Sequence, residues 1–138
     1  MKIKVKNSGA VNLRFHADFP DGDLFIAEAG KDIPFRVKRS YFINNLSNKK
    51  AVRGKHAHRK LTQIIFAVNG SFKLSLDDGK SKQTIKLKDP SMGIILGPML
   101  WHTMTDFSKD CVILVFADDF YKESDYIRDY KKFREVLR

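Results

Sequence analysis

Two histidines spaced two residues apart, His56 and His58, are the side chains of this sequence with the clearest chemical potential. If they lie on a β-strand, residues at this spacing share a face, and the two imidazoles form a pair. Imidazole is the side chain whose ordinary pKa lies nearest neutrality, so the pair suits either proton transfer or metal ligation. A His-x-His pattern also occurs on surfaces and in structural roles, so the rest of the sequence has to decide.

The elements that would position these histidines are short strands. Apolar and polar residues alternate over residues 3–5, 72–76 and 84–87, which is the period-two pattern of half-buried strands. Turn-forming sequences separate such segments, and two of them, Asn69-Gly70 and Asp78-Gly79, predict tight hairpin turns. Many short strands at this spacing indicate an all-β sandwich or barrel.

The end of the chain has a different pattern. Apolar residues recur at helical spacing from Tyr126 to Leu137, and Ser124 precedes them as a candidate N-cap. The sequence therefore predicts a short C-terminal helix that starts after Ser124.

Length and composition indicate one domain, residues 1–138. A chain of 138 residues, 43% of them hydrophobic, can bury one core. Its single cysteine, Cys111, excludes an intramolecular disulfide, and the longest apolar run, 111–117, is too short to span a bilayer. The N-terminus lacks the apolar region of a secretory signal, so we expect a cytoplasmic protein with no membrane partner.

The formal net charge of +10 raises the question of nucleic-acid binding. The lysines are scattered over turns and alternating strand faces instead of forming one cluster, which favours a solvated basic surface. We therefore expect no nucleic-acid partner, although such a field would also attract a substrate that carries a diphosphate.

The segment around the histidine pair resembles the first motif of the cupin superfamily, with Gly54 before the histidines and the turn glycine Gly70 after them. The sequence Gly-Pro-Met-Leu-Trp-His at 97–102 is similar to the second cupin motif. This resemblance implies that His102 enters the mouth of the same barrel.

One position departs from the metal-binding cupin pattern. Gln63 stands where the motif carries its glutamate, and a neutral amide is a poor substitute for an anionic ligand. Three histidines can still hold zinc or iron with an open coordination position. Metal-free use of the site is our expectation, and a metal-dependent cupin enzyme is the alternative.

A narrower resemblance, to the sugar 3,4-ketoisomerases that act on dTDP-4-keto-6-deoxyglucose, covers nearly the whole chain. The motifs that carry it are, in chain order, Ile33-Pro34-Phe35, Val37-Lys38-Arg39 with Tyr41, Arg53-Gly54 with His56-Ala57-His58, Leu76-Asp77-Asp78-Gly79, Gly97-Pro98 with Trp101-His102, Asp106-Phe107-Ser108, and Asp125-Tyr126-Ile127-Arg128-Asp129-Tyr130. As an ordered set they are specific. The resemblance implies a cupin-type double-stranded β-helix, or jelly-roll barrel, that forms a homodimer and needs neither a cofactor nor a metal.

The activity that the resemblance implies moves the ketone of dTDP-4-keto-6-deoxy-D-glucose from C4 to C3. The product is a dTDP-3-keto-6-deoxyhexose, which an aminotransferase then converts to a 3-amino sugar for lipopolysaccharide, S-layer or another glycan. The reaction needs a base for the C3 proton and proton transfers through an enediol. His56 and His58 are assigned to these tasks jointly.

The other matched positions are candidates for substrate binding. Tyr41 would donate to a sugar oxygen or stabilise the enediolate, and His102 and Gln63 complete the sugar site. Arg39 and Arg53 would bind the diphosphate, because a guanidinium offers several donors in a fixed fork.

Some positions leave alternatives open. Trp101 and Tyr126 either stack on the thymine or belong to the core. Asp21 replaces an arginine that many family members carry near the sugar, whereas His102, where some relatives have arginine, suggests the galacto product. These two clues disagree on the stereochemistry at C4. A non-catalytic cupin that binds a nucleotide sugar is a further alternative, and it predicts binding without turnover.

Overall fold

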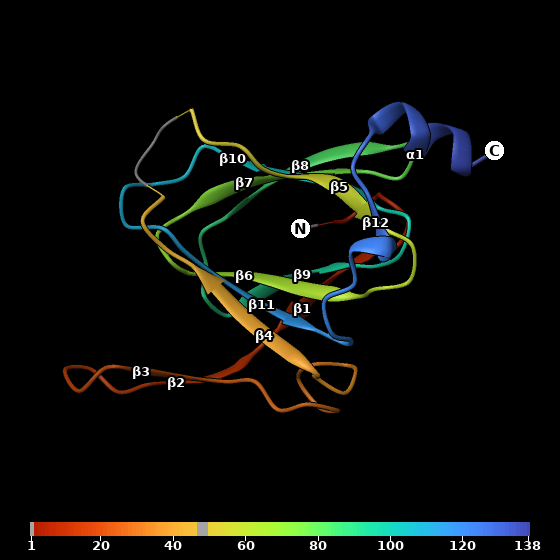
Figure 1. Cartoon of the computed structure of the whole chain (residues 1–138). Coiled ribbons are helices and arrows are strands. Elements are labelled where there is room, and N and C mark those ends of the chain that lie inside the picture. Colours follow the sequence, from red (N-terminus) through yellow and green to blue (C-terminus); the bar gives the residue numbers. More distant parts are fainter. Residues whose placement is uncertain (1, 47–49) are drawn as a thin grey trace.

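The structure, a computed structural model, describes residues 2–46 and 50–138. Two five-stranded antiparallel sheets face each other and form a barrel (Figure 1). The first sheet contains, in spatial order, β1 (Ser8–Asn12), β9 (Met92–Leu96), β6 (Gln63–Asn69), β11 (Val112–Ala117) and β4 (Arg39–Ile43). The second sheet contains β12 (Tyr126–Ile127), β5 (Arg53–His58), β10 (Trp101–Thr105), β7 (Phe72–Asp77) and β8 (Lys82–Leu87).

The path of the chain through these sheets defines the fold. Between β4 and β12 the chain passes from one sheet to the other at every connection except the β7–β8 hairpin. This alternation produces the jelly-roll of a cupin-type double-stranded β-helix. The predicted fold class is therefore confirmed.

The two turns predicted as hairpins behave differently. Asp78-Gly79 joins the paired strands β7 and β8, and Gly79 has a positive φ of 94°, as expected. The prediction for Asn69-Gly70 is wrong, because β6 pairs with β9 and β11 while β7 lies in the opposite sheet. Gly70 still needs to be glycine: its φ is 67°, and an added Cβ would lie 2.9 Å from the Cα of Cys111.

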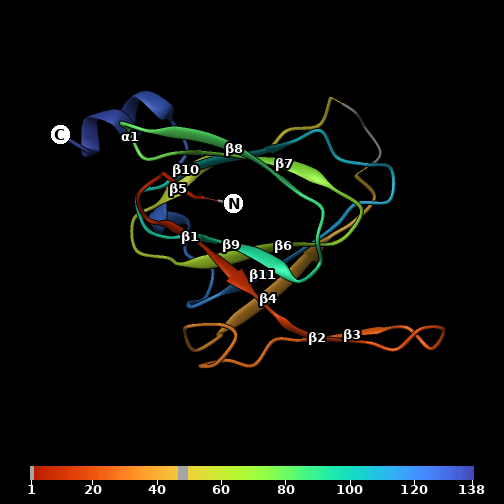
Figure 2. The same ribbon diagram turned by 180° about the vertical axis from the view of Figure 1, so that it is seen from behind.

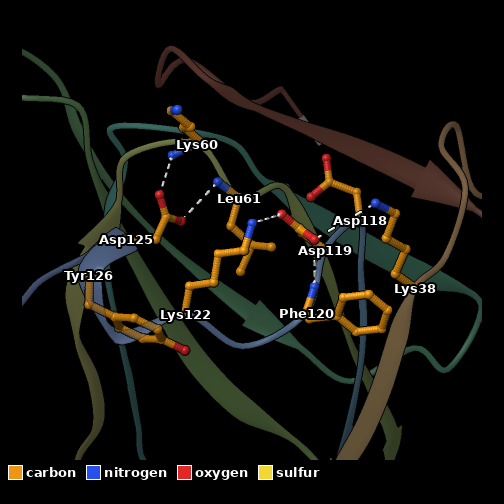
Figure 3. Close-up of a pocket in the computed structure, with 9 residues that line it drawn as sticks. All are labelled: Lys38, Lys60, Leu61, Asp118, Asp119, Phe120, Lys122, Asp125 and Tyr126. Carbon is orange, nitrogen blue, oxygen red and sulfur yellow. Dashed lines mark hydrogen bonds and ion pairs between the residues drawn. The ribbon is translucent and has the colours of Figure 1, made fainter.

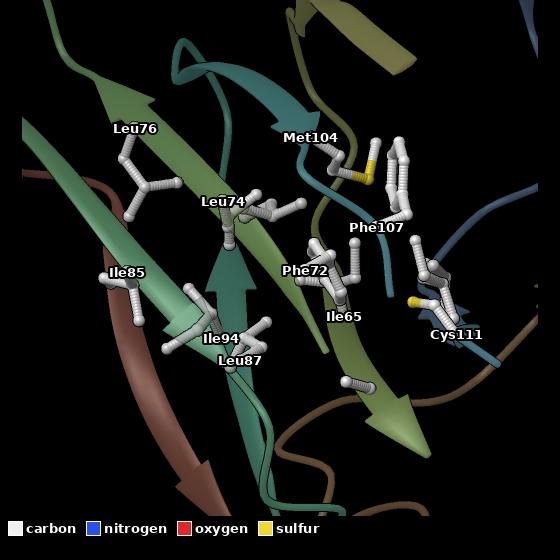
Figure 4. Packing of buried hydrophobic residues seen from close by; sticks show 14 of the residues in the cluster. Ile65, Phe72, Leu74, Leu76, Ile85, Leu87, Ile94, Met104, Phe107 and Cys111 are labelled. Carbon is white, nitrogen blue, oxygen red and sulfur yellow. The ribbon is translucent and has the colours of Figure 1, made fainter. Parts of the chain in front are cut away.

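Apolar side chains from alternate strand positions fill the barrel (Figure 4). On β7, Phe72, Leu74 and Leu76 are at most 1% exposed, and they pack with Ile65 and Ile94 of the first sheet. Truncation of a buried phenylalanine such as Phe72 to alanine costs roughly 3–5 kcal/mol in proteins. The core therefore fixes the two sheets against each other and gives the strands that carry the histidines a rigid base.

The C-terminal helix is confirmed, but its predicted start is wrong. A short 3₁₀ turn, Glu123–Asp125, leads into strand β12, and the helix α1 (Tyr130–Val136) begins only after Asp129. Asp129 is the N-cap, accepting a hydrogen bond from the backbone N–H of Lys132 at 3.0 Å. Tyr126 and Ile127 adopt an extended conformation because they pair with the edge of β5. Without this pairing, backbone groups at that edge of β5 would have no partner from β12.

Helix α1 packs on the outer face of the second sheet. Phe133 is fully buried there against Ala57 and Ile127, so the helix covers the back of the strand that carries the histidine pair. No helix within the described residues has the length and apolar character that crossing a bilayer requires.

A separate two-stranded ribbon projects from the barrel. It consists of β2 (Arg14–Ala17) and β3 (Asp23–Ile26), which pair with each other and extend away from both sheets (Figures 1 and 2). The rings of Phe15 and Phe25 stack at 5.4 Å and are 53% and 36% exposed. The ribbon therefore presents apolar side chains to solvent.

Candidate functional site

Three histidines from two neighbouring strands meet inside the barrel. His56 and His58 lie on β5, and the antiparallel register places His102 of β10 opposite His56. The ring centroid of His56 lies 4.8 Å from that of His58 and 4.7 Å from that of His102. His58 and His102 are only 1% and 2% exposed. The structure thus brings together the predicted pair and the third histidine.

A β-bulge in β5 shapes the entrance to this cluster. The register shifts between His102 and Thr103, and Gly54 and Lys55 have positive φ values of 82° and 59°. Glycine is required at 54 because an added Cβ would lie 2.8 Å from the carbonyl oxygen of His102. Beyond the bulge, Arg53 is opposite Met104, whose side chain lies in the barrel, so the bulge moves Arg53 to the face that carries the histidines.

Backbone carbonyls define the protonation of two of the rings. Nδ1 of His56 lies 3.1 Å from the oxygen of Gly54, and Nδ1 of His102 lies 3.1 Å from the oxygen of Leu100. A carbonyl only accepts, so in each neutral ring Nδ1 carries the hydrogen and Nε2 keeps a free lone pair. Within the described residues, neither ring nitrogen of His58 has a hydrogen-bond partner, although both are buried.

Burial and mutual repulsion keep the three imidazoles neutral. Burial, followed by the charge of His58, lowers the pKa of His56 from 6.5 to about 4. Burial lowers the pKa of His58 and that of His102 to about 3, and the charge of a neighbouring histidine contributes to the decrease in both. Near pH 7 the cluster therefore offers neutral bases, each able to accept a proton.

The opposite wall of the barrel supplies polar groups from the first sheet. Gln63 of β6 is 2% exposed, and its Nε2 donates to the hydroxyl of Tyr41 on β4 at 3.1 Å. Burial raises the pKa of Tyr41, and the Gln63 hydrogen bond and the charges of Arg39 and Arg53 offset part of that rise. Tyr41 is therefore a neutral hydrogen-bond donor at any physiological pH.

Arg39, next to Tyr41, has guanidinium nitrogens without hydrogen-bond partners among the described residues. Its guanidinium carbon lies 5.5 Å from the ring centroid of Tyr41 and 5.9 Å from that of Tyr121. Nε and Nη2 are buried and have no hydrogen-bond partner among the described residues. Because buried donors are almost always paired, this side chain is poised to bind an anionic or polar group of a ligand.

Three other residues singled out in the sequence lie at the rim of the barrel or outside it. Arg53 is exposed, and its charge reaches Tyr41, so it lies at the rim. Trp101 alternates with His102 along β10 and packs outside the barrel against Phe133, as the core interpretation predicts. Asp21 belongs to the exposed turn between β2 and β3, a ribbon that extends away from the strands β5 and β10 (Figure 1).

Of the aromatic lining, sequence reasoning named Tyr126, for thymine stacking or the core, but missed Tyr121. Tyr126 contacts the histidines, with ring centroids 4.9 Å from His56 and 4.5 Å from His58. Tyr121 packs on Tyr126 at 5.5 Å. The motif at 125–130 was a signal for Tyr126, but no periodicity singles out Tyr121, which follows the last long strand in an irregular segment.

Tyr126 also lines a small cavity (Figure 3). It has a volume of about 160 Å³, and three lysines and three aspartates line it together with apolar side chains. The aspartates are already engaged: Asp118, for example, accepts from the amide of Thr62, and Asp125 accepts from the amides of Lys60 and Leu61. With its charges balanced, this cavity is a weaker diphosphate site than the rim that carries Arg39 and Arg53.

The histidine cluster also has a geometry that a metal could use. The ligand atoms that His56, His58 and His102 offer lie within 4.8 Å of one another, and two of the rings have Nδ1 held by a carbonyl, as metal-bound histidines often do. These three residues would hold a zinc or iron ion, which would polarise a bound carbonyl. Gln63 does not add an anionic ligand, because its amide is neutral, and its Nε2 instead donates to Tyr41.

Comparison with known proteins identifies the family. The family model described as FdtA: WxcM-like, C-terminal matches residues 6–138. The TDP-4-oxo-6-deoxy-alpha-D-glucose-3,4-oxoisomerase of Aneurinibacillus thermoaerophilus is 46% identical over 116 residues, which are 84% of this chain and 83% of the relative.

Solved structures agree with this match. A histidine-to-asparagine variant of the 3,4-ketoisomerase QdtA from Thermoanaerobacterium thermosaccharolyticum, in complex with TDP-4-keto-6-deoxyglucose, has a TM-score of 0.92 and 38% identity, covering 96% of this chain and 95% of QdtA. WlaRA, a TDP-fucose-3,4-ketoisomerase from Campylobacter jejuni, has a TM-score of 0.88 and 33% identity, covering 96% of each chain. The chain therefore belongs to the WxcM-like family of cupin-fold sugar-nucleotide 3,4-ketoisomerases.

Proposed function

We propose that this protein moves the ketone of TDP-4-keto-6-deoxyglucose from C4 to C3 by metal-free acid–base catalysis, within one domain that comprises residues 1–138. The observation that carries the proposal is the cluster of neutral imidazoles, two of them buried and His56 half-buried, in which His58 has two nitrogens without partners among the described residues. The family match over residues 6–138 supports the extent of the domain.

The reaction needs only proton transfers, which these residues can supply. A base removes the proton on C3, the electron pair forms a C3–C4 double bond, and the C4 carbonyl oxygen takes a proton to give the enediol. The C3 hydroxyl then loses its proton, C3 becomes the ketone, and C4 receives a proton. No electron acceptor is required, and a positioned imidazole typically contributes a factor of roughly 10²–10⁴ to such a step.

His56 and His58 are proposed as the joint acid and base. Both lie on the inner face of β5, and the lone pair of His56 is on Nε2 because Nδ1 faces the carbonyl of Gly54. His102, across the β5–β10 pair, is placed to pass a proton to or from one face of the sugar. The face of C4 that receives the proton, and so the stereochemistry of the product, then depends on how the sugar is oriented over the three rings.

The polar wall opposite is proposed to bind the substrate. Tyr41, oriented by Gln63, donates to the sugar oxygen that becomes negative in the enediolate. Arg39 has buried, unpaired nitrogens and Arg53 lies at the rim, so these two bind the diphosphate.

The test is NMR of TDP-4-keto-6-deoxyglucose incubated with the purified protein in deuterated water. We expect the C4 ketone signals to be replaced by those of a C3 ketone, with deuterium at C4. An unchanged spectrum would refute the isomerase function. If ligand signals nevertheless broadened, the chain would be a binding protein without turnover.

Metal-dependent use of the three histidines is the second candidate, favoured by the 4.8 Å spacing of their ligand atoms. Elemental analysis and chelation separate the two. Substoichiometric metal with activity retained in a chelator supports the metal-free mechanism. One equivalent of zinc or iron per chain, with activity lost on chelation, supports the alternative.

We also propose a homodimer in which the β2–β3 ribbon contacts a second copy. The exposed, stacked Phe15 and Phe25 would be covered there, and a second copy could bring the ribbon turn with Asp21 to a barrel mouth that its own chain does not reach. Light scattering should give twice the chain mass of 15.9 kDa. Phe15→Ser should give monomers, whereas Val136→Ser, at an exposed position on α1, should not.

Two expectations from the sequence stay predictions: a cytoplasmic location, and a product destined for a 3-amino sugar of lipopolysaccharide or another glycan. Fractionation of cells tests the first. Conversion of the product by a sugar aminotransferase tests the second.

A further inference from the structure

We propose that Tyr126 is a positioning residue for His58, held in place by a brace that Arg128 and Glu123 form. The inference rests on the proposed function, because it concerns the same histidines. It assigns a task to the segment 123–128, for which the sequence predicted the start of a helix and, at Tyr126, thymine stacking or core packing.

His58 lacks the polar contact that orients the other two rings. His56 and His102 each have Nδ1 fixed at 3.1 Å from a backbone carbonyl. His58 has no hydrogen bond on either nitrogen within the described residues, so ring packing alone sets its orientation. Tyr126 makes the tightest of its ring contacts, at 4.5 Å with an interplanar angle of 72°, compared with 4.8 Å for His56 and 5.7 Å for His102.

Tyr126 is itself anchored on both sides. The register of β12 places it directly opposite His58, and Ile127 beside it is 2% exposed under helix α1. Upstream, the Asp125 carboxylate accepts from the amides of Lys60 and Leu61 at 2.9 and 3.1 Å, as Figure 3 shows. The backbone at Tyr126 therefore cannot shift without breaking several hydrogen bonds.

A charged brace then holds the ring. The Arg128 guanidinium carbon lies 4.3 Å from the Tyr126 centroid, the closest cation–ring contact among the described residues. Arg128 donates from Nε and Nη2 to the two carboxylate oxygens of Glu123 at 2.7 and 2.9 Å, and Tyr121 donates its hydroxyl to Glu123 as well. A bidentate pair of this kind fixes the guanidinium plane, and the plane in turn restrains the aromatic ring.

This arrangement leaves both nitrogens of His58 without a partner among the described residues, while the Tyr126 ring restrains the rotation of the imidazole. A hydrogen-bonded partner would occupy one nitrogen, whereas an aromatic wall orients the ring without occupying either. Misplacement of a catalytic group by about 1 Å can cost roughly 10²-fold in rate. Tyr126 should therefore affect the catalytic step more than substrate binding.

The experiment compares Tyr126→Leu, which removes the ring, with Tyr126→Phe, which keeps it. We expect Tyr126→Leu to lower kcat roughly 10–100-fold with KM within about twofold, and Tyr126→Phe to stay within about twofold of wild type. Tyr130→Leu is the matched control, because Tyr130 lies four residues further along, at the start of α1, and packs outside the barrel on Trp101. It should leave kcat unchanged.

Two results would overturn the proposal. If Tyr126→Leu kept near-wild-type kcat, the ring would not position His58. If Tyr126→Phe were as slow as Tyr126→Leu, the hydroxyl would act in catalysis and Tyr126 would be a catalytic residue instead. Should Tyr126→Leu fail to fold, Arg128→Gln is the second variant, expected to lower kcat roughly 3–10-fold while Lys73→Gln, at another exposed ion pair, has no effect.

A readout that needs no turnover separates this proposal from the isomerase function. In wild type the His58 ring protons experience the ring current of Tyr126, so their NMR shifts should move in Tyr126→Leu and remain in Tyr126→Phe. Unmoved His58 signals in Tyr126→Leu would refute the positioning role, whether or not the wild-type protein isomerises the sugar. Moved signals in a protein without turnover would refute only the proposed reaction.

Discussion

Replacement of His58 should make the protein less sensitive to acid. Burial, the neighbouring His102 and the charges of Arg39 and Arg128 lower the pKa of His58 from 6.5 to about 3. A group whose pKa is lowered in the folded state contributes stability above its unfolded pKa, and that stability is lost as the pH falls towards the folded value. The sensitive window for His58 therefore runs from about pH 6.5 down to about pH 3.

The size of the effect follows from these two values. At pH 5 the unfolded chain has His58 mostly protonated, while the folded chain keeps it neutral. Linkage then removes about 2 kcal/mol of stability between pH 7 and pH 5 for this one histidine. His58→Gln lacks the titrating group, so its loss of stability over the same interval should be smaller by roughly 1–2 kcal/mol.

Urea unfolding at pH 7 and pH 5, in the presence of a chelator so that no metal competes for the imidazoles, measures the difference. His16→Gln is the control, since that ring lies exposed on the ribbon strand β2, and it should retain the wild-type difference. If His58→Gln lost as much stability between the two pH values as wild type, His58 would not be buried as a neutral group, and the account of the site as neutral bases would be wrong.

Other predictions concern activity, binding and packing. His56→Asn and His58→Asn should each lower turnover by roughly two or more powers of ten and still bind dTDP, as calorimetry can check, and near-wild-type rates in both would contradict the catalytic assignment. Arg53→Ala should reduce the rise in melting temperature that dTDP causes without changing that of the free protein, whereas a large loss in the free protein would mark Arg53 as structural. Phe133→Ala should destabilise the protein by roughly 3–5 kcal/mol in urea unfolding, and a loss below about 1 kcal/mol would mean that α1 is not docked through this ring.

The parts of the fold that follow a local rule could be predicted from the sequence. The two-residue spacing of His56 and His58 placed both rings on one face because side chains alternate along a strand. The Asp78-Gly79 hairpin was predictable because its turn chemistry is local. Neither prediction needed knowledge of which strands are neighbours.

The errors occur where distant contacts decide the structure. Asn69-Gly70 has the same turn chemistry as Asp78-Gly79, but the partners of β6 and β7 lie in different sheets, and no local signal encodes that. The helical spacing after Ser124 corresponds to a helix only after Asp129, because the pairing of Tyr126 with the edge of β5 outweighs helix propensity. The face of Arg53 depends on a bulge, which shifts the alternation by one residue.

Gln63 illustrates how one substitution connects the fold with the chemistry. A glutamate at this buried position would place a negative charge inside the barrel, and an anion favours the protonated form of a nearby imidazole. Such a charge would raise the pKa values of the histidines in the barrel, so they would bind a proton or a metal ion more readily than they do beside a neutral amide. The amide instead adds no charge and donates to Tyr41, which leaves the tyrosine hydrogen free to point at substrate. A neutral residue at 63 therefore fits the proposed metal-free mechanism, in which an unprotonated imidazole accepts the C3 proton, and it removes the anionic ligand that a metal-binding cupin would use.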